Sequence, residues 1–378
     1  MIPQEVFNET LLGFLAPIRH YLDDKSVTEV MINGHQKIYV ERKGKLQRVG
    51  ETFPSNEALL SALRNIAQYA GKQLDELHPI LEGRLPDGSR VQAVVPPVSY
   101  GGVSVAIRRF SPSMYTMPTL IQFGALTEDC AMTLAALVHS KLNVIVAGGT
   151  GSGKTSMLNT LSRSIPEDER VVVIEDSKEV QLQQEHVVYL EARPPDPKGR
   201  GAVTIRDLFR TTLRMRPDRI VIGEIRGGEA LDIVQAMVSG HGGCMGTLHA
   251  TYPRDTMTRL ETMAMMSDVE IPLAALRLQI ASGINIILQV ARLHDGTRKV
   301  THISEVTGYD LATMKYQIQD LFIRKWRPDG QGHSTSELVP TGILPQCTEQ
   351  LHEHGTDLPQ CVYEAVERRG AEGTAAES

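Results

Sequence analysis

The stretch VIVAGGTGSGKTSML, residues 144–158, decides the fold class of this 378-residue chain. Four apolar residues run into a glycine-rich segment that satisfies G-x-x-x-x-G-K-[S/T] in full, and a helical pattern follows. Glycines let backbone N–H groups turn inward around phosphate oxygens, and the positive end of the following helix adds to that field. Because motif and context agree, they favour a phosphate-binding loop over a glycine-rich turn without a ligand.

The loop predicts both nucleotide and metal contacts. Its nucleotide-binding residues are Gly148, Gly149, Thr150, Gly151, Ser152, Gly153, Lys154, Thr155 and Ser156. We expect Lys154 to meet the β- and γ-phosphates of a nucleotide and the Thr155 hydroxyl to ligate Mg²⁺.

Strands and helices alternate on both sides of the loop. Strands are predicted at 142–147, 171–175, 219–223 and 244–248, and helices at 127–140, 204–214 and 228–239. This alternation is typical of an α/β domain with a doubly wound, mostly parallel sheet.

Changes of pattern along the chain predict four parts. A smaller α+β N-terminal domain covers residues 1–112 and includes a helix at 56–70, for which Asn56 is a possible cap. Residues 113–126 form a link, in a stretch with two prolines and a glycine. The α/β domain covers 127–320, and a polar, partly irregular C-terminal appendage covers 321–378.

Composition argues against several classes of protein. The net charge of −6 offers no general attraction to nucleic acid, so no nucleic-acid partner is expected. Four widely spaced cysteines without a CxxC pair disfavour a disulfide framework or a zinc site and fit a reducing cytosol. No apolar run reaches about 18 residues, so we expect any membrane association to come through a partner or a surface.

Two predicted strands end in carboxylates. RVVVIED, residues 170–176, contains Glu175, and RIVIGE, residues 219–224, ends in Glu224. The second segment resembles a Walker B strand, but it has Gly223 at the position where a Walker B strand usually has an aspartate. Because the carboxyl ends of parallel strands face the ligand crevice, both acids are candidates for managing water and Mg²⁺. The alternative for each is a charge at the solvent-facing surface.

Histidines and arginines extend this set. His241 and His249 flank the strand predicted at 244–248, and each is either a structural hydrogen-bonding residue or a group beside the phosphate. Arg206, Arg210 and Arg214 recur every four residues and so share one helical face. That face is either solvated or serves a γ-phosphate, in its own subunit or a neighbour's.

Four segments together resemble a known set of motifs. They are GGTGSGKTS (148–156), VIEDSKEVQL (173–182), RMRPDRIVIGEIRGGEA (214–230) and SGHGGCMGTLHA (239–250). They look like the Walker A, Asp box, Walker B and His box of the type II/IV secretion and pilus-assembly ATPases. The resemblance is greatest to the CpaF-type ATPases of Tad/Flp pilus systems and covers nearly the whole chain.

The resemblance implies a fold and an activity. It implies a RecA-like P-loop NTPase domain, homohexameric rings, and nucleotide held between the two lobes of each subunit. It implies hydrolysis of ATP with Mg²⁺, coupled to domain rotation that powers pilus assembly or protein secretion. The implied place is cytoplasmic and peripheral at the inner membrane, beside the inner-membrane platform proteins of such a machine.

The resemblance also implies residue roles. Glu175 and Glu224 would manage water and Mg²⁺, so Glu224 joins Thr155 as a metal-site residue. His241 and His249 would sense the γ-phosphate. The remaining implied residues are Arg108 and Arg90, which would touch nucleotide from the N-terminal lobe, and Arg214, which would serve the γ-phosphate.

Two other functions stay open from sequence. One is a conjugation-type secretion ATPase or a nucleic-acid translocase on the same scaffold, since fold does not settle function. The other is a nucleotide-gated docking module with little turnover, which the glycine at position 223 leaves possible. DNA-stimulated turnover and steady-state phosphate release separate these from the motor.

Overall fold

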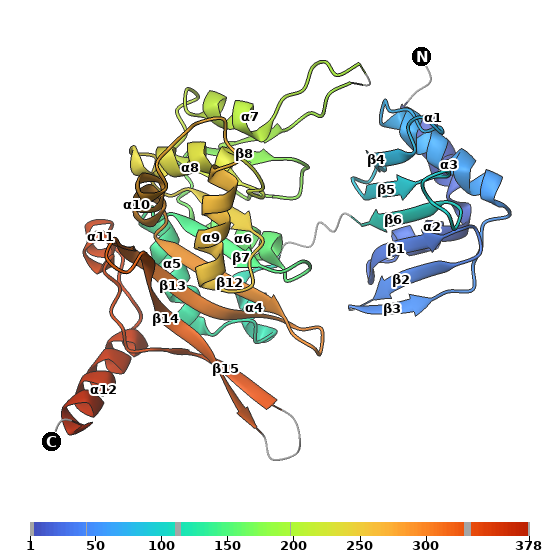
Figure 1. Ribbon diagram of the computed structural model, residues 1–378. Coiled ribbons are helices and arrows are strands. Elements are labelled where there is room, and N and C mark those ends of the chain that lie inside the picture. Colours follow the sequence, from blue (N-terminus) through green and yellow to red (C-terminus); the bar gives the residue numbers. More distant parts are fainter. Residues whose placement is uncertain (1–3, 43, 110–114, 197, 329–333, 377–378) are drawn as a thin grey trace. The chain divides into compact units, whose positions relative to one another are not determined.

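The computed structural model describes residues 4–42, 44–109, 115–196, 198–328 and 334–376 (Figure 1). The chain divides into two compact units: Met1–Ser113 with Pro195–Gly201, and Met114–Pro194 with Ala202–Ser378. No helix in these described ranges has the length and hydrophobicity needed to cross a membrane.

The first unit is built on a six-stranded antiparallel sheet in the order β3-β2-β1-β6-β5-β4. Its strands are β1 (Val27–Asn33), β2 (Ile38–Arg42), β3 (Lys45–Arg48), β4 (Ile80–Arg84), β5 (Arg90–Val94) and β6 (Ser104–Arg108). Its helices are α1 (Gln4–Phe14), α2 (Ala16–Asp23) and α3 (Asn56–Tyr69). Alternate strand residues such as Val30 and Ile32 are buried against the apolar face of α3.

Helix α3 is capped by Ser55 and begins at Asn56. Ser55 is extended, and its side chain accepts a hydrogen bond from the Ala58 N–H at 3.2 Å. Asn56 is already helical, and its Oδ1 lies within hydrogen-bond distance of the His35 N–H. The prediction that Asn56 caps this helix is therefore wrong, because the capping residue must lie outside the helical region.

The second unit contains a nine-stranded sheet in the order β15-β14-β13-β12-β7-β11-β10-β8-β9. Its strands are β7 (Val144–Gly148), β8 (Val171–Glu175), β9 (Val187–Glu191), β10 (Arg219–Ile222), β11 (Met245–Leu248), β12 (Ile286–Arg292), β13 (Arg298–Asp310), β14 (Lys315–Pro328) and β15 (Ser334–Pro340). The six strands from β12 to β9 run parallel, whereas β13, β14 and β15 add antiparallel pairs. The predicted mostly parallel sheet is confirmed, with an antiparallel extension.

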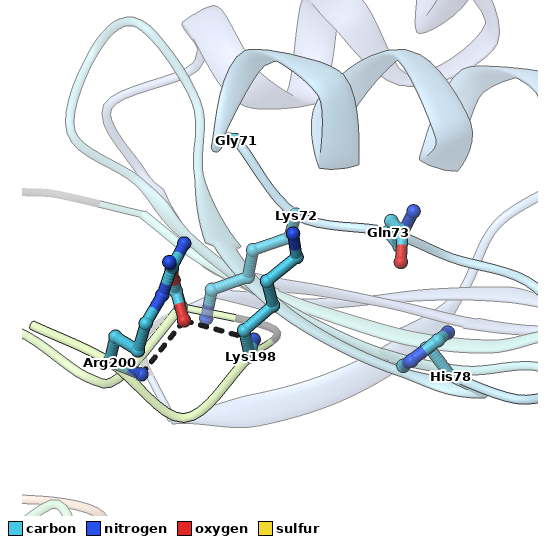
Figure 2. A pocket seen from close by; sticks show the side chains of 7 residues that line it. Gly71, Lys72, Gln73, His78, Lys198 and Arg200 are labelled. Carbon is cyan, nitrogen blue, oxygen red and sulfur yellow. Dashed lines mark hydrogen bonds and ion pairs between the residues drawn. The ribbon is translucent and has the colours of Figure 1, made fainter.

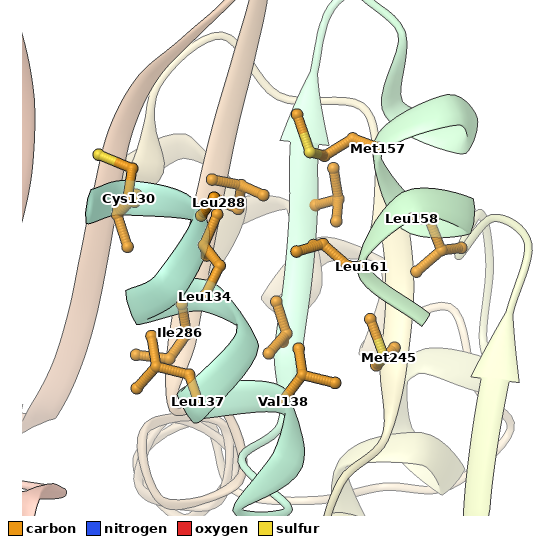
Figure 3. Close-up of a cluster of buried hydrophobic side chains, with 14 of the residues drawn as sticks. Cys130, Leu134, Leu137, Val138, Met157, Leu158, Leu161, Met245, Ile286 and Leu288 are labelled. Carbon is orange, nitrogen blue, oxygen red and sulfur yellow. The ribbon is translucent and has the colours of Figure 1, made fainter. Parts of the chain in front are cut away.

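Helices cover both faces of this sheet, as a doubly wound domain requires (Figure 1). They are α4 (Met117–Gln122), α5 (Glu128–His139), α6 (Lys154–Leu161), α7 (Ile205–Thr212), α8 (Glu229–Val238), α9 (Pro253–Ala264), α10 (Leu273–Gly283), α11 (Thr348–Glu353) and α12 (Gln360–Ala376), with a short 3₁₀ turn at Ser162–Ser164. Side chains of β7 alternate between two cores: Val144 and Val146 join the first, Ile145 and Ala147 the second. Figure 3 shows part of the first core, where Leu134 and Leu137 of α5 lie near Ile286 and Leu288 of β12.

Two segments differ from their predicted character. Residues 113–126, predicted as a link, contain α4, whose Leu120 is buried in the core of the second unit. Residues 321–378, predicted as a polar appendage, supply most of β14, all of β15 and two helices. Their buried residues Leu338, Leu351 and Val362 belong to the same core. The sequence looks polar here because few strand residues are buried: within the described side chains of β15, only Leu338 is.

Candidate active site

The glycine-rich loop joins β7 to α6 at the carboxyl edge of the parallel strands. Gly151 and Gly153 have φ of +68° and +92°, in the left-handed region that favours glycine. A Cβ at Gly148 would lie 2.5 Å from both Ser152 Oγ and the Val290 carbonyl oxygen, so a side chain does not fit there. The loop therefore has the backbone form of an anion-binding nest, as its sequence predicts.

Lys154 starts α6 and is largely buried beneath this loop. Its Nζ donates to the Gly149 carbonyl oxygen at 3.0 Å and lies 3.4 Å from the His249 ring nitrogens. A lysine is rarely buried without partners, so the loop itself holds the ammonium group. From this position Lys154 Nζ can donate to a phosphate oxygen in place of the Gly149 carbonyl oxygen.

Glu175 ends β8 and organises the segment that follows it. It is 4% exposed, and its Oε1 accepts backbone N–H groups of Glu179 and Val180 at 2.9 and 2.8 Å. A Cβ at Gly223 on the adjacent strand end would lie 2.8 Å from Glu175 Cγ. Glu175 is thus no solvent-facing strand end, and Gly223 leaves room for its side chain.

Glu179 is a site residue that the sequence analysis did not single out. Its Oε2 accepts a hydrogen bond from the Thr155 hydroxyl at 3.1 Å. The signal was present in the EDSKE pattern, where a third acid follows Glu175 by four residues. Hydrogen bonds from the backbone of this segment to Glu175 fix its position. They hold the Glu179 carboxylate beside the Thr155 hydroxyl, which is predicted to ligate Mg²⁺.

The donor chemistry around Thr155 suits Mg²⁺, which prefers hydroxyl, carboxylate, phosphate and water oxygens. Among the described residues no group of three or more His, Cys, Asp or Glu side chains could hold a metal ion. A magnesium ion would therefore be bound together with phosphate oxygens and water, with few protein ligands.

Glu224 lies just beyond β10 and is held from two sides. Its Oε2 accepts from Arg226 Nη2 at 2.6 Å, and its Oε1 lies 3.0 Å from His249 Nε2. Arg226 also contacts Asp176 at 3.1 Å, so it joins the acids that follow two neighbouring strands. This arginine, too, was not singled out from sequence.

The charges around Glu224 keep it ionised. Burial raises the pKa of Glu224, but the hydrogen bond and charge of Arg226, aided by His249 and Lys154, leave the pKa below its usual value. Burial and then the charge of Lys154 lower the pKa of His249 despite Glu224. At neutral pH the site therefore offers a carboxylate and a neutral imidazole.

Two predicted residues lie away from the loop. His241 precedes β11, whereas His249 follows it, so β11 separates them, and a four-residue strand spans about 13 Å. Arg214 follows α7 close to the segment where Asp218 and Arg170 bond at the start of β8 and β10. Both lie at the amino edge of the parallel strands, and neither reaches the loop of its own chain.

Two arginines of the predicted stripe, Arg206 and Arg210, bond to an acid on α8, although Arg210 is also exposed to solvent. Arg206 Nε and Arg210 Nε donate to Asp232 on α8 at 2.6 and 2.8 Å. These two arginines therefore pin α7 to α8 and support the sheet.

The N-terminal arginines form a row on the first unit. Arg108 on β6 lies opposite Arg90 on β5, which lies opposite Arg84 on β4. Arg108 is also 3.8 Å from Glu29 on β1. Like charges placed directly opposite one another destabilise a sheet. The row therefore places three guanidinium groups side by side on neighbouring strands of the first unit, with Glu29 beside Arg108.

The first unit also carries a basic hollow, shown in Figure 2. It is lined by Gly71, Lys72, Gln73, His78, Asp196, Lys198 and Arg200. Asp196 accepts hydrogen bonds from backbone N–H groups of Lys198 and Arg200 and from the Arg200 side chain, and so shapes the tip of that loop. The lining of the hollow contains no residue of the glycine-rich loop.

Comparisons with known proteins give a consistent family. A model described as "Type II/IV secretion system protein" matches residues 14–344. The chain is 34% identical over 298 residues to a Mycobacterium tuberculosis protein named for conjugal transfer, covering 77% of this chain and 83% of that one. It is 32% identical over 329 residues to the type IV secretion system protein VirB11 of Brucella suis, covering 80% and 90%.

Solved structures share the fold. The ATPase DotB of Legionella pneumophila gives a TM-score of 0.53 at 20% identity, covering 80% of this chain and 82% of that one. The pilus retraction motor PilT with bound ADP gives 0.52 at 16% identity, covering 93% and 92%. These ATPase structures support the RecA-like fold with a preceding domain.

Proposed function

Because the chain belongs to the type II/IV secretion system protein family, we propose that it is an ATP-hydrolysing motor that powers pilus assembly or protein secretion. The observation that carries the proposal is one cluster at the carboxyl edge of the sheet. There Lys154 lies beneath the loop, 3.4 Å from His249, and His249 lies 3.0 Å from Glu224. A docking module needs the cradle but has no need of an ionised acid beside it.

The nest and Lys154 bind the phosphate chain of the nucleotide. Backbone N–H groups of the loop donate to phosphate oxygens, and the Lys154 ammonium leaves the Gly149 carbonyl for the β- and γ-phosphates. When bound, Mg²⁺ neutralises negative charge on these phosphates. The chain would hold it through the Thr155 hydroxyl and, by way of water, the Glu179 and Glu224 carboxylates.

Glu224 orients the attacking water. Its carboxylate accepts a hydrogen bond and then a proton from the water, whose oxygen bonds to the γ-phosphorus while the bond from that phosphorus to the β–γ bridging oxygen breaks. The products are ADP and inorganic phosphate. His249 is neutral and bonded to Glu224, so a contact between His249 and the γ-phosphate would also change its hydrogen bond to this acid. Glu175 acts through the backbone of Glu179 and is a positioning residue.

Arg214 and the N-terminal arginines enter as parts of an assembly. Since Arg214 lies at the opposite edge of its own sheet, we assign its γ-phosphate role to the site of a neighbouring subunit, in a homohexameric ring. The charge row that contains Arg90 and Arg108 supports their contact with nucleotide from the first unit. His241 has no place in the site of its own chain, and its buried Nδ1 lacks a hydrogen-bond partner among the described residues.

The motif resemblance favours a Tad/Flp pilus machine whose inner-membrane platform proteins recruit the motor to the cytoplasmic face. The names of the sequence relatives favour a second candidate, a conjugation-type secretion ATPase. The net charge of −6 offers no general attraction to DNA and favours the first.

Phosphate release by the purified protein with ATP and Mg²⁺ tests the proposal, with sizing in the same buffer and Lys154→Ala as the inactive control. Steady release by a ring-sized species that Lys154→Ala abolishes supports a motor. Binding without release favours a docking module. Release that DNA stimulates, with the stimulation lost at high salt, favours a nucleic-acid translocase.

A further inference from the structure

We propose that Arg292 and Arg298 are further binding residues of the nucleotide site, two guanidinium groups that flank the phosphate loop and bond to the phosphates that it holds. The inference rests on the proposed nucleotide binding and extends it to the β12–β13 hairpin. Neither arginine belongs to the four motifs of the sequence analysis.

Sheet order brings this hairpin to the loop. Strand β12 pairs in parallel with β7, and Val290 lies opposite Gly148, where the loop begins. Two residues later β12 ends at Arg292, so the hairpin continues past the loop at the same edge of the sheet. The two arginines are therefore carried by the strand that adjoins the phosphate-binding strand.

A tight turn presents the two arginines together. Arg292 and Arg298 are register partners across the antiparallel strands. The turn between them is closed by the Leu293 N–H donating to the Thr297 carbonyl at 2.8 Å, and Gly296 adopts φ +83°. Asp295 accepts from the Thr297 N–H at 2.9 Å. This preorganised turn limits the entropy lost when the arginines meet a ligand.

Both arginines lie against the phosphate loop. Arg298 Nε donates to the Gly151 carbonyl oxygen at 2.9 Å. A Cβ at Gly153 would lie 3.1 Å from Arg298 Cδ, and one at Gly151 would lie 3.5 Å from Arg292 Nη1. Because Gly151 and Gly153 have no Cβ, they leave room for the arginine side chains. They also adopt the left-handed backbone conformation of the loop.

Two like charges directly opposite each other on neighbouring strands destabilise a sheet. Lys299, the next cation along, donates to the carbonyl oxygens of Phe123 and Gly124. A polyphosphate in the adjacent nest would bring negative charge beside both guanidinium groups, so the pair favours the nucleotide-bound state over the empty one.

The expected effect concerns affinity more than chemistry. One charge-assisted hydrogen bond of ordinary strength corresponds to about a tenfold change in affinity. Arg298→Gln is therefore expected to raise the Kd and KM for ATP about tenfold and to leave kcat within about twofold. Arg298→Lys keeps the charge and one donor, so it should retain part of the affinity.

The test compares Arg298→Gln, Arg292→Gln and Arg298→Lys with Arg368→Gln, which makes the same change at an exposed position on α12. ATP binding with Mg²⁺ is titrated at about 0.05 M and about 0.5 M salt, because added salt screens exposed charges. The melting temperature is recorded with and without ATP and Mg²⁺. The parent protein must first bind ATP, and its failure to do so would count against the proposed function itself.

Support requires two results together. The glutamine variants at 292 and 298 bind ATP more weakly than Arg368→Gln, and this difference in Kd becomes smaller at high salt. Without ligand they melt no lower than the parent, and ATP raises their melting temperature less. If they bind ATP as Arg368→Gln does, or if their loss of affinity accompanies a lower melting temperature without ligand, the inference is overturned while nucleotide binding by the parent stands.

Discussion

Gly223→Ala is expected to damage the site by displacing Glu175, although it adds only one methyl group. The new Cβ would lie 2.8 Å from Glu175 Cγ and 3.0 Å from its Oε1, where ordinary contact begins near 3.4 Å. Glu175 must therefore move by about 0.6 Å, the difference between 3.4 and 2.8 Å. Its bonds to the backbone of Glu179 and Val180 would lengthen accordingly.

Overpacking of this kind costs about 1–3 kcal/mol of unfolding free energy. In a domain of this size each kcal/mol lowers the melting temperature by about 2–4 °C. The measurement is the melting transition that ATP and Mg²⁺ shift, since that transition reports the second unit. Gly50→Ala is the control for the substitution itself, because a Cβ there meets no atom within 4 Å and Gly50 lies in the first unit, so this transition should stay at the parent's temperature.

A double-mutant comparison isolates the cause. In a Glu175→Ala background the added methyl group has room, so Gly223→Ala should change the melting transition by less than about 0.5 kcal/mol. If the full cost persists in that background, or if Gly223→Ala melts like Gly50→Ala in the parent, the steric account of position 223 is refuted.

Two further outcomes follow from other contacts. Glu179→Gln keeps a hydrogen-bond acceptor for Thr155 but loses the charge, so the Mg²⁺ concentration for half-maximal turnover should rise about 10- to 100-fold, and an unchanged Mg²⁺ titration would remove Glu179 from the metal site. Asp24 has its pKa lowered to about 2 by hydrogen bonds from Ser26 and then by Arg42. Its contribution to stability is therefore present above the usual pKa and is lost as pH falls toward 2. Asp24→Asn should flatten the loss of stability of the first unit between about pH 4 and pH 2, and melting curves with the parent's pH dependence would contradict this.

The sequence predicted the parallel half of the large sheet well, because each strand there is a short apolar run that leads into a motif. The predicted strands at 171–175 and 219–223 correspond to β8 and β10 within one residue. The antiparallel extension was harder to see. Its strands mix buried and exposed residues without the regular alternation that marks a half-buried strand, and their pairing connects positions that local patterns do not relate.

Sequence motifs singled out residues that the structure brings together, but they did not indicate contacts that cross between strands. The loop, Glu224 and His249 lie in motifs whose spacing carries the signal. Arg298 contacts Gly151 across 147 positions, which no local pattern reveals. His241 was grouped with His249 because they share one motif. Strand β11 lies between them, so His241 lies at the amino end of that strand and His249 at its carboxyl end.

Glu224→Gln tests the central claim most directly, with ATP binding and steady-state phosphate release measured on the same assembled sample in the presence of Mg²⁺. The amide keeps the size of the side chain but cannot accept a proton from water. We predict that the variant binds ATP about as tightly as the parent and loses nearly all turnover. Hydrolysis at the parent rate would contradict the account.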